Sequence, residues 1–237
     1  MKMIENSAQA RAETVSKLRE SFGIPNEITD ASRMSFGIPE IDLLIGGLPG
    51  GAITEVVGER SSGRTTLMLS ALAATSKTDL CALVDTSDNL DVVSADAAGI
   101  DLHNFLWSRC GSNVDCALKV TELLLRSGLF ALVVLDLGNV SAAEARDIQS
   151  ACWVRFRLAL ENSSNVLLVI GQQSLVQSLA GLVLRMNRED SDFSVIGHNK
   201  KIPAFTNLLN GVKFKTEQQR PFAINTRTDF YASVPFR

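Results

Sequence analysis

The sequence predicts an α/β fold, in which a mainly parallel sheet carries helices on both faces and antiparallel strands at one edge. Short apolar runs rich in Val, Ile and Leu alternate with helical segments along most of the chain, which is typical of buried parallel strands. One turn rich in Gly and Ser, residues 58–65, joins such a run to a helix. After Ser174 apolar and polar residues alternate, as they do in antiparallel edge strands.

The composition is that of one ordinary globular domain. With 237 residues, of which 46% are hydrophobic, the chain can bury a sizeable core without disulfides or a structural metal. Its apolar runs are far shorter than the roughly 18–20 residues of a membrane-spanning helix. The first residues contain no apolar signal segment. We therefore expect a cytoplasmic protein that does not bind membranes.

The net charge and the histidine and cysteine spacings argue against a basic nucleic-acid-binding protein and against a metal site. A formal net charge of -3 excludes a globally basic nucleic-acid binder, although a surplus of basic residues between Arg185 and Arg237 leaves a local basic face open. His103 and His198 have no partners at ligand spacing, so we expect no histidine metal site. Four cysteines match neither a zinc pattern nor a CxxC pair and are expected to be buried, reduced thiols: Cys81, Cys110, Cys116 and Cys152.

The chain is expected to begin with a short amphipathic helix. Val15, Leu18 and Phe22 recur at helical spacing among charged residues, and Gly23 and Pro25 follow. This helix could fold back on its own domain or dock on another subunit, and the sequence does not choose between them. The expected organisation is an N-terminal helix, a linker and one core domain, over residues 1–24, 25–34 and 35–237.

Within the core, the apolar and helical patterns predict the elements in order. Buried strands are predicted at residues 52–57, 81–84, 105–108, 129–135 and 165–170. The helices predicted between them cover residues 65–75, 92–98, 114–126 and, as one long helix, 142–162. Antiparallel strands at the sheet edge are predicted at residues 182–187, 211–216 and 222–225.

Residues 58–65, GERSSGRT, have the spacing of a phosphate-binding loop, GxxxxGK[ST]. The two glycines let the backbone curl so that N–H groups and the next helix N-terminus face an anion. Arg64 stands where the pattern has lysine, and a planar guanidinium is not expected to hold phosphate in the same pose. Thr65 keeps the hydroxyl that would ligate Mg²⁺, and Asp136, at a strand end, could hold that ion through water.

Several segments resemble the RecA family of recombinases. The stretch LLIGGLPGGAITEVVGERSSGRTTL, which starts at Leu43, resembles the beginning of the RecA core, and residues 81–108 resemble the segment that follows. The likeness continues through VVLD at 133–136, GQQ at 171–173 and the edge strands, so it covers residues 35–225. It implies a RecA-like core whose nucleotide site would use Gly58, Ser61, Ser62, Gly63, Arg64, Thr65, Thr66, Asp91, Asp136 and Gln172.

The chain departs from the family in its chemistry. By the resemblance, Ser87 stands in place of the glutamate that activates the attacking water, and a hydroxyl cannot hold that proton at neutral pH. Ser94 replaces the aromatic residue that stacks on adenine, while Asp91 would still face the adenine edge and Gln172 keeps the γ-phosphate sensor position. We expect no firmly bound cofactor and no hydrolysis; weak binding of ATP with Mg²⁺ stays open.

The parts that contact DNA in the family are reduced as well. Residues 138–141 lead almost directly into a helix, and residues 173–178 leave no room for the second mobile loop. The lysine pair that reaches a neighbour's ATP should lie near residues 216–218, which read TEQ. The family's large C-terminal DNA-gathering domain is not expected, because the sequence stops at Arg237.

These departures resemble those of the ImuA proteins, the RecA-like members of bacterial mutagenesis cassettes. The resemblance implies a catalytically silent accessory protein of the SOS DNA damage response that supports translesion synthesis. Its expected partners are RecA and an error-prone polymerase or Y-family polymerase homologue; a weak contact with single-stranded DNA and self-association stay open. Two alternatives remain: a divergent DNA-dependent ATPase or recombinase, with Asp88 or Glu59 as base, and a nucleotide-independent regulator such as a cell-division inhibitor.

Overall fold

The computed structural model describes residues 33–195, 207–221 and 227–233. The chain divides into two units, Met1–Ser32 and Arg33–Arg237, and every described residue belongs to the second. The predicted N-terminal helix, nearly all of the predicted linker and the predicted strand at residues 222–225 lie outside the described residues.

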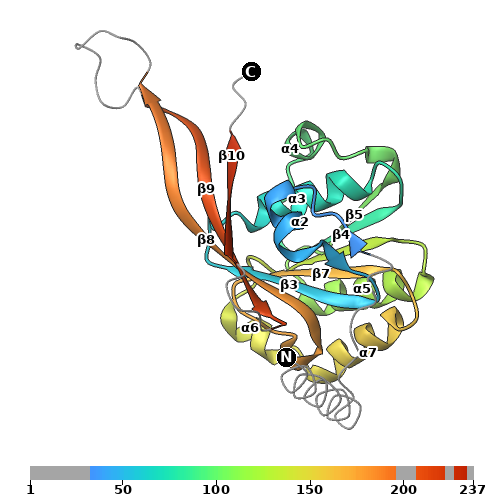
Figure 1. The fold of residues 1–237 in the computed structure, drawn as a ribbon. Helices are drawn as coiled ribbons and strands as arrows, with labels where there is room; N and C mark the ends of the chain where they lie inside the picture. Colours follow the sequence, from blue (N-terminus) through green and yellow to red (C-terminus); the bar gives the residue numbers. More distant parts are fainter. Residues whose placement is uncertain (1–32, 196–206, 222–226, 234–237) are drawn as a thin grey trace, which may run out of the picture. The chain divides into compact units, whose positions relative to one another are not determined.

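One mixed sheet forms the centre of the second unit (Figure 1). Its strands run in the order β10-β9-β8-β3-β7-β6-β4-β5. From β8 to β5 every pair of neighbours is parallel, whereas β8–β9 and β9–β10 are antiparallel, so the predicted α/β class with an antiparallel edge is confirmed. The strands are β3 (Ala52–Gly58), β4 (Cys81–Asp85), β5 (Phe105–Arg109), β6 (Leu132–Asp136), β7 (Val166–Gly171), β8 (Ala180–Val195), β9 (Asn207–Arg220) and β10 (Arg227–Ser233).

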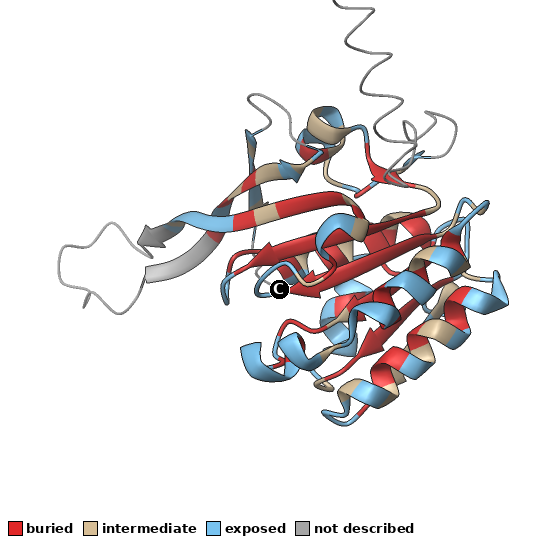
Figure 2. Cartoon of the chain, turned by 90° about the horizontal axis from the view of Figure 1, so that it is seen from below, coloured by how far each residue is buried: buried red, intermediate tan, exposed pale blue. Residues whose placement is uncertain are grey.

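Helices cover both faces of this sheet and bury two apolar clusters against it. One cluster packs α3 side chains such as Leu67 and Leu72 on one face, and the other packs Leu118 of α5 and Phe156 of α7 on the opposite face. Figure 2 shows buried residues along the central strands and exposed residues on the outer sides of the helices. The helices are α2 (Pro39–Ile45), α3 (Arg64–Thr75), α4 (Val92–Ala97), α5 (Val114–Ser127), α6 (Ala142–Asp147) and α7 (Ser150–Leu160).

Two predictions about helices and edge strands were wrong in detail. The single helix predicted over residues 142–162 is divided into α6 and α7, because Ile148 and Gln149 adopt extended backbone angles and Ile148 packs against the apolar cluster beneath. The segment predicted as an antiparallel strand at 182–187 belongs to the longer β8, which is antiparallel to β9 but parallel to β3. Its parallel edge continues the buried part of the sheet.

Some elements were not predicted from the sequence. Helix α2 begins with Pro39 at its first turn, where proline is tolerated. A two-stranded sheet pairs β1 (Arg33–Met34) with β2 (Leu48–Pro49), and β10 adds a third antiparallel strand beside β9. Phe230 is buried on β10, while the residues beside it in sequence are not.

The parallel register brings the polar strand ends to one edge of the sheet. Asp85 at the end of β4 lies beside Asp136 at the end of β6, and Asp136 lies beside Ile170 of β7. On β3, Val57 lies beside Gly171, directly before the predicted phosphate-binding loop. In open parallel sheets, ligands bind outside this carboxyl edge.

Two further expectations can be compared with the described residues. None of their helices is both long and apolar enough to cross a membrane. All four cysteines are free; three are buried and Cys116 is half-buried.

Candidate nucleotide site

Residues 58–65, named the phosphate loop from here on, leave β3 and lead into α3. The loop turns through Ser61 and Gly63, whose φ angles of +60° and +90° lie in the left-handed region. Helix α3 starts at Arg64 and has 12 residues, and no side chain caps its N-terminus. Its first backbone N–H groups are therefore available to an anion at the loop.

The glycines of the phosphate loop are fixed by close neighbours. A Cβ atom on Gly63 would lie 2.7 Å from the ring of Phe214 on β9, and one on Gly58 would collide with the Met186 carbonyl and with Ser62 Oγ. Phe214 is buried and packs on Phe230 of β10, with ring centroids 5.3 Å apart. The antiparallel strands thus support the phosphate loop directly.

Two buried side chains of the phosphate loop each carry a polar atom without a hydrogen-bond partner. Ser62 is 3% exposed and its Oγ is unpaired, while Arg64 is 8% exposed and its Nη1 is unpaired. Burial lowers the pKa of the Arg64 guanidinium, although the charge of Asp136 acts in the opposite direction and that of Arg60 adds to the lowering. Unsatisfied buried donors of this kind need an explanation, such as a bound ligand.

Arg64 and Asp136 approach each other next to Gly138. A Cβ atom built on Gly138 would lie 2.9 Å from Asp136 Oδ1 and 3.3 Å from Arg64 Nη1. Gly138 N–H donates a 2.8 Å hydrogen bond to Asp136 Oδ1. Burial raises the pKa of the Asp136 carboxyl and the charge of Asp85 adds to this, whereas the Gly138 bond and Arg64 lower it.

Gln172, which the resemblance implies to be the γ-phosphate sensor, also contacts Gly138. Gln172 Nε2 donates a 3.1 Å hydrogen bond to the Gly138 carbonyl. Arg64, Asp136, Gly138 and Gln172 therefore form one connected group at the carboxyl edge of the sheet. Thr65 is exposed and Thr66 half-buried on the first turn of α3.

These residues fit a phosphate group better than a magnesium ion. The unpaired Ser62 Oγ and Arg64 Nη1 are donors at a helix N-terminus, which suits an oxyanion. Mg²⁺ would need the charge of Asp136, but the cation that faces this carboxylate is Arg64 of the chain itself. Asp136 Oδ1 also accepts a hydrogen bond from Gly138 N–H, which leaves this oxygen less available to a metal ion.

The two acids next to Ser87, where the resemblance implies that a catalytic base is missing, both have partners within the protein. Asp85 is buried and accepts hydrogen bonds from Ser87 N at 3.1 Å, Leu90 N at 3.0 Å and Trp107 Nε1 at 3.2 Å. Asp88 forms an ion pair with Arg109 at 3.2 Å. Both acids near Ser87 are thus committed to partners within their own segment and β5.

Asp91 and Ser94, the residues expected near the adenine of a nucleotide, bond to each other instead. Asp91 is the N-cap of α4 and accepts from Val93 N, Ser94 N and Ser94 Oγ at 3.3, 3.0 and 2.5 Å. Hydrogen bonds from Ser94, first through its side chain, lower the pKa of Asp91. Both residues are exposed, and the bonds that Asp91 makes all go to the first turn of α4.

Sequence reasoning missed Glu55, the one acid in the apolar strand β3. It is 1% exposed and accepts hydrogen bonds from Ser174 Oγ at 2.6 Å, Leu175 N at 2.6 Å and Val176 N at 2.9 Å. Glu55 thereby fixes the short connection between β7 and β8, residues 172–179, to the strand that carries the phosphate loop. A lone acid within a buried strand was the only available signal.

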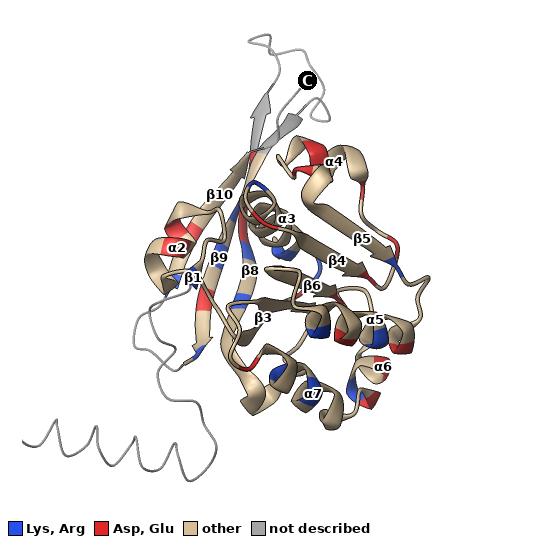
Figure 3. Cartoon of the chain, turned by 90° about the vertical axis from the view of Figure 1, so that its right-hand side faces the viewer, with Lys and Arg blue, Asp and Glu red and all other residues tan. Residues whose placement is uncertain are grey.

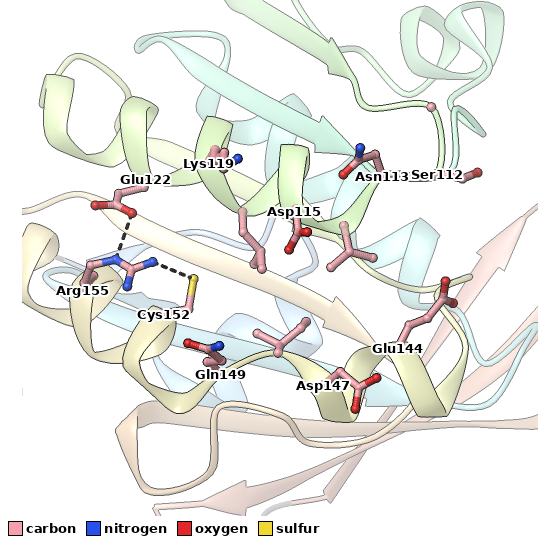
Figure 4. Close-up of a pocket in the computed structure, with 14 residues that line it drawn as sticks. Ser112, Asn113, Asp115, Lys119, Glu122, Glu144, Asp147, Gln149, Cys152 and Arg155 are labelled. Carbon is pink, nitrogen blue, oxygen red and sulfur yellow. Dashed lines mark hydrogen bonds and ion pairs between the residues drawn. The ribbon is translucent and has the colours of Figure 1, made fainter.

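Two cavities lie near α6 and α7. The larger, of about 710 Å³, is lined by α5 and by the α6–α7 segment and contains the Glu122–Arg155 ion pair of 3.0 Å (Figure 4). The smaller, of about 500 Å³, lies between α7 and the 172–179 connection and includes Trp153 and Leu175. Neither cavity is lined by the phosphate loop.

Basic and acidic residues both occur on the edge strands (Figure 3). Lys213 bridges Glu189 and Asp229, each at 2.9 Å, and Arg227 pairs with Glu217 at 3.0 Å. The basic residues named here are thus neutralised by neighbouring acids rather than gathered into one basic track; Lys200 and Lys201 lie outside the described residues.

Comparisons with known proteins agree with the resemblance to the RecA family. The RecA N-terminal domain matches residues 5–148, which is more than half of the chain. "Protein RecA" of Acinetobacter baumannii is 35% identical over 144 residues, covering 56% of this chain and 41% of that protein. "Protein RecA" of Rhizobium leguminosarum bv. trifolii is 43% identical over 111 residues, covering 46% of this chain and 30% of that protein. "Protein RecA" of Psychrobacter cryohalolentis is 34% identical over 146 residues, covering 56% of this chain and 41% of that protein.

The chain thus aligns with less than half the length of these relatives. The matched residues include the phosphate loop, Asp85 and Asp136, whereas Gln172 and strands β8 to β10 follow the matched part. On this match, the chain belongs to the RecA N-terminal domain family.

Proposed function

We propose that this chain is a RecA-like accessory protein of the SOS DNA damage response, which supports translesion synthesis by binding partners rather than by hydrolysing ATP. The proposed partners are RecA and an error-prone polymerase or a Y-family polymerase homologue. Family membership supports the link to DNA repair and recombination, and the likeness to ImuA proteins supports the accessory role.

The single observation that carries this proposal is the absence of a base at Ser87. Loss of a positioned general base typically costs about 10²–10⁴-fold in rate. Asp88 cannot replace it without breaking its 3.2 Å ion pair with Arg109, and Glu59 is exposed on the phosphate loop. A core that keeps the family fold without this group is better suited to binding than to turnover.

The short connections support the same conclusion. Only residues 137–141 separate β6 from α6, and only residues 172–179 separate β7 from β8. A capping box between Ser141 and Glu144 fixes the first connection, and Glu55 fixes the second. Segments held in this way lack the freedom expected of mobile loops that order on DNA.

Direct binding to purified RecA tests the partner proposal. We expect the full chain to bind RecA filaments assembled on single-stranded DNA with ATPγS, as measured by biolayer interferometry. Leu18→Asp should weaken the binding at least tenfold if the predicted N-terminal helix takes part, whereas its neighbour Lys17→Ser should not. Absence of binding both to RecA and to the polymerase partner would refute the accessory role.

ATP turnover separates this proposal from a divergent ATPase. We expect no hydrolysis above that of the Thr65→Ala variant, with or without single-stranded DNA. DNA-stimulated hydrolysis that is lost in Asp88→Asn would instead favour the ATPase, since Asp88 is then the base. The chain should keep RecA binding in the Thr65→Ala variant, because the contact does not depend on turnover.

A further inference from the structure

The phosphate loop contains donors that the protein itself does not satisfy. Ser62 Oγ and Arg64 Nη1 are both buried and both without a hydrogen-bond partner, and both lie at the N-terminus of the 12-residue helix α3. Ser62 Oγ is directed toward Gly58 across the loop, since a Cβ atom there would collide with it. An oxyanion within the loop would satisfy these donors together with the first N–H groups of α3.

The positive charge beside Asp136 is the guanidinium of Arg64. Arg64 Nη1 and Asp136 Oδ1 lie 3.3 and 2.9 Å from one common point beside Gly138, and the two groups interact electrostatically without a direct hydrogen bond. Two cations cannot share this place without strong repulsion.

The part of the site that would select a nucleobase is weak. Ser94 has no ring to stack on a base, and the Asp91 carboxylate is used as the cap of α4. Base stacking typically contributes about 1–3 kcal/mol in complexes that have it. The recognition that remains is for phosphate.

We propose that the phosphate loop binds a diphosphate group without magnesium, with Arg64 as the cation between Asp136 and the ligand, and with little preference for a nucleobase. In this arrangement Arg64 replaces both the usual lysine and the metal ion. The guanidinium can do so because its planar fork directs donors to two oxyanions at once, whereas an ammonium is a single point charge. The proposal concerns the ligand of the loop and does not depend on the protein partners proposed above.

Calorimetric titration of the full chain with inorganic pyrophosphate tests the proposal, once in EDTA and once in MgCl₂. We expect binding in EDTA that Mg²⁺ does not strengthen, and an affinity for ADP within about threefold of that for pyrophosphate. No binding of pyrophosphate, or binding that requires Mg²⁺, would overturn the proposal. Binding of ADP alone would overturn the lack of base preference and indicate a conventional nucleotide site.

Arg64→Lys and a control variant test whether Arg64 is responsible for binding without Mg²⁺. Arg64→Lys should lose at least tenfold in affinity in EDTA and recover on addition of Mg²⁺, because the carboxylate of Asp136 is then free for the metal. Arg157→Lys on α7 is the matched control and should bind like the unchanged chain. Equal behaviour of Arg64→Lys and the control would contradict the role of Arg64.

Ser62→Ala keeps the test valid if Arg64→Lys does not fold. Its free energy of unfolding without ligand should not fall, because the hydroxyl that is removed has no partner. Its affinity for pyrophosphate should fall several-fold. Unchanged affinity in this variant would remove Ser62 from the site and leave the phosphate loop without a buried side-chain hydroxyl to explain phosphate recognition.

Discussion

At the scale of single residues, the polar groups that could bind a ligand are those without a hydrogen-bond partner in the protein. From the sequence, Asp88 is an alternative base and Asp91 would face the adenine edge, yet both are committed to partners within the protein, as is Asp85. Ser62 and Arg64, by contrast, carry buried donors without partners. The chemistry left to this edge of the sheet therefore belongs to the phosphate loop.

Gly63 should be intolerant of a side chain for two separable reasons. Alanine there must adopt a φ of +90° and must also displace the Phe214 ring. Gly99 has a similar φ of +87° with no atom within 4 Å of its Cβ position, so Gly99→Ala should cost only the backbone strain, about 1 kcal/mol. Overpacking should add about 1–3 kcal/mol in Gly63→Ala. Urea unfolding of both variants measures the difference; equal losses would mean that Phe214 moves freely.

Glu55→Gln should destabilise the protein, because the new amide NH₂ faces donors that need an acceptor. We expect a loss of about 1–3 kcal/mol in the free energy of unfolding. Amide hydrogen exchange should accelerate at Leu175 and Val176, whose N–H groups bond to Glu55. The exposed Glu59→Gln serves as control and should change stability by less than about 0.5 kcal/mol. Unchanged exchange at both amides would show that the connection does not depend on Glu55.

At the scale of elements, apolar patterning predicted the strands well and the interruptions badly. The runs that became β3, β4, β6 and β7 are buried along their length, so their sequence reports their environment. The break between α6 and α7 contains neither Gly nor Pro, and it follows from the packing of Ile148, which only the folded core supplies. The contacts of Glu55 and Phe214 join positions more than 100 residues apart, and no local pattern encodes them.

Helix α6 should depend strongly on its capping box, because it has only six residues. Ser141 Oγ accepts from Glu144 N at 3.2 Å, and the Glu144 carboxylate accepts from Ser141 N at 3.3 Å. Ser141→Ala should cost about 1 kcal/mol, which corresponds to roughly fivefold more local opening. The rate of first tryptic cleavage at Arg146 measures this opening. The exposed Ser150→Ala at the start of α7 is the control; equal rates would show that packing alone holds α6.

At the scale of the whole molecule, a parallel core and an antiparallel edge combine in one sheet. The parallel order brings Asp85, Asp136 and Gln172 to one edge of the sheet. The sequence could not predict that Arg64 would face Asp136, because the pose of a guanidinium depends on the loop around it. The domain limits predicted for residues 1–34 remain a prediction, since only residues 33 and 34 of that range are described.

The stability of the whole protein should depend on pH through Asp136. Burial raises its pKa in the fold, so the folded chain binds this proton more tightly than the unfolded chain does. The resulting stabilisation is fully present below the ordinary pKa of about 3.9 and is lost as the pH rises through the higher folded value. Asp136→Asn should therefore be more stable than the unchanged chain at pH 7, with the advantage shrinking toward pH 4.

Urea unfolding across this pH range measures the dependence, and the exposed Asp147→Asn is the control. Because Asn Oδ1 can still accept from Gly138 N–H, the substitution removes the charge without breaking that bond. A loss of stability at pH 7 in Asp136→Asn would mean that Arg64 needs the carboxylate more than burial penalises it.

The indole of Trp107 allows the carboxyl edge of the sheet to be followed by fluorescence. Its Nε1–H donates to Asp85 at 3.2 Å, and the Arg109 guanidinium lies 5.1 Å from its ring centroid. Trp153, the second tryptophan, is buried against Phe156 on the other face of the sheet. The two fluorophores therefore report on different regions, and a change in the fields of Asp85 or Arg109 should shift the emission of Trp107 alone. Stopped-flow fluorescence of a Trp153→Phe variant would follow events at the carboxyl edge in real time, without any added dye.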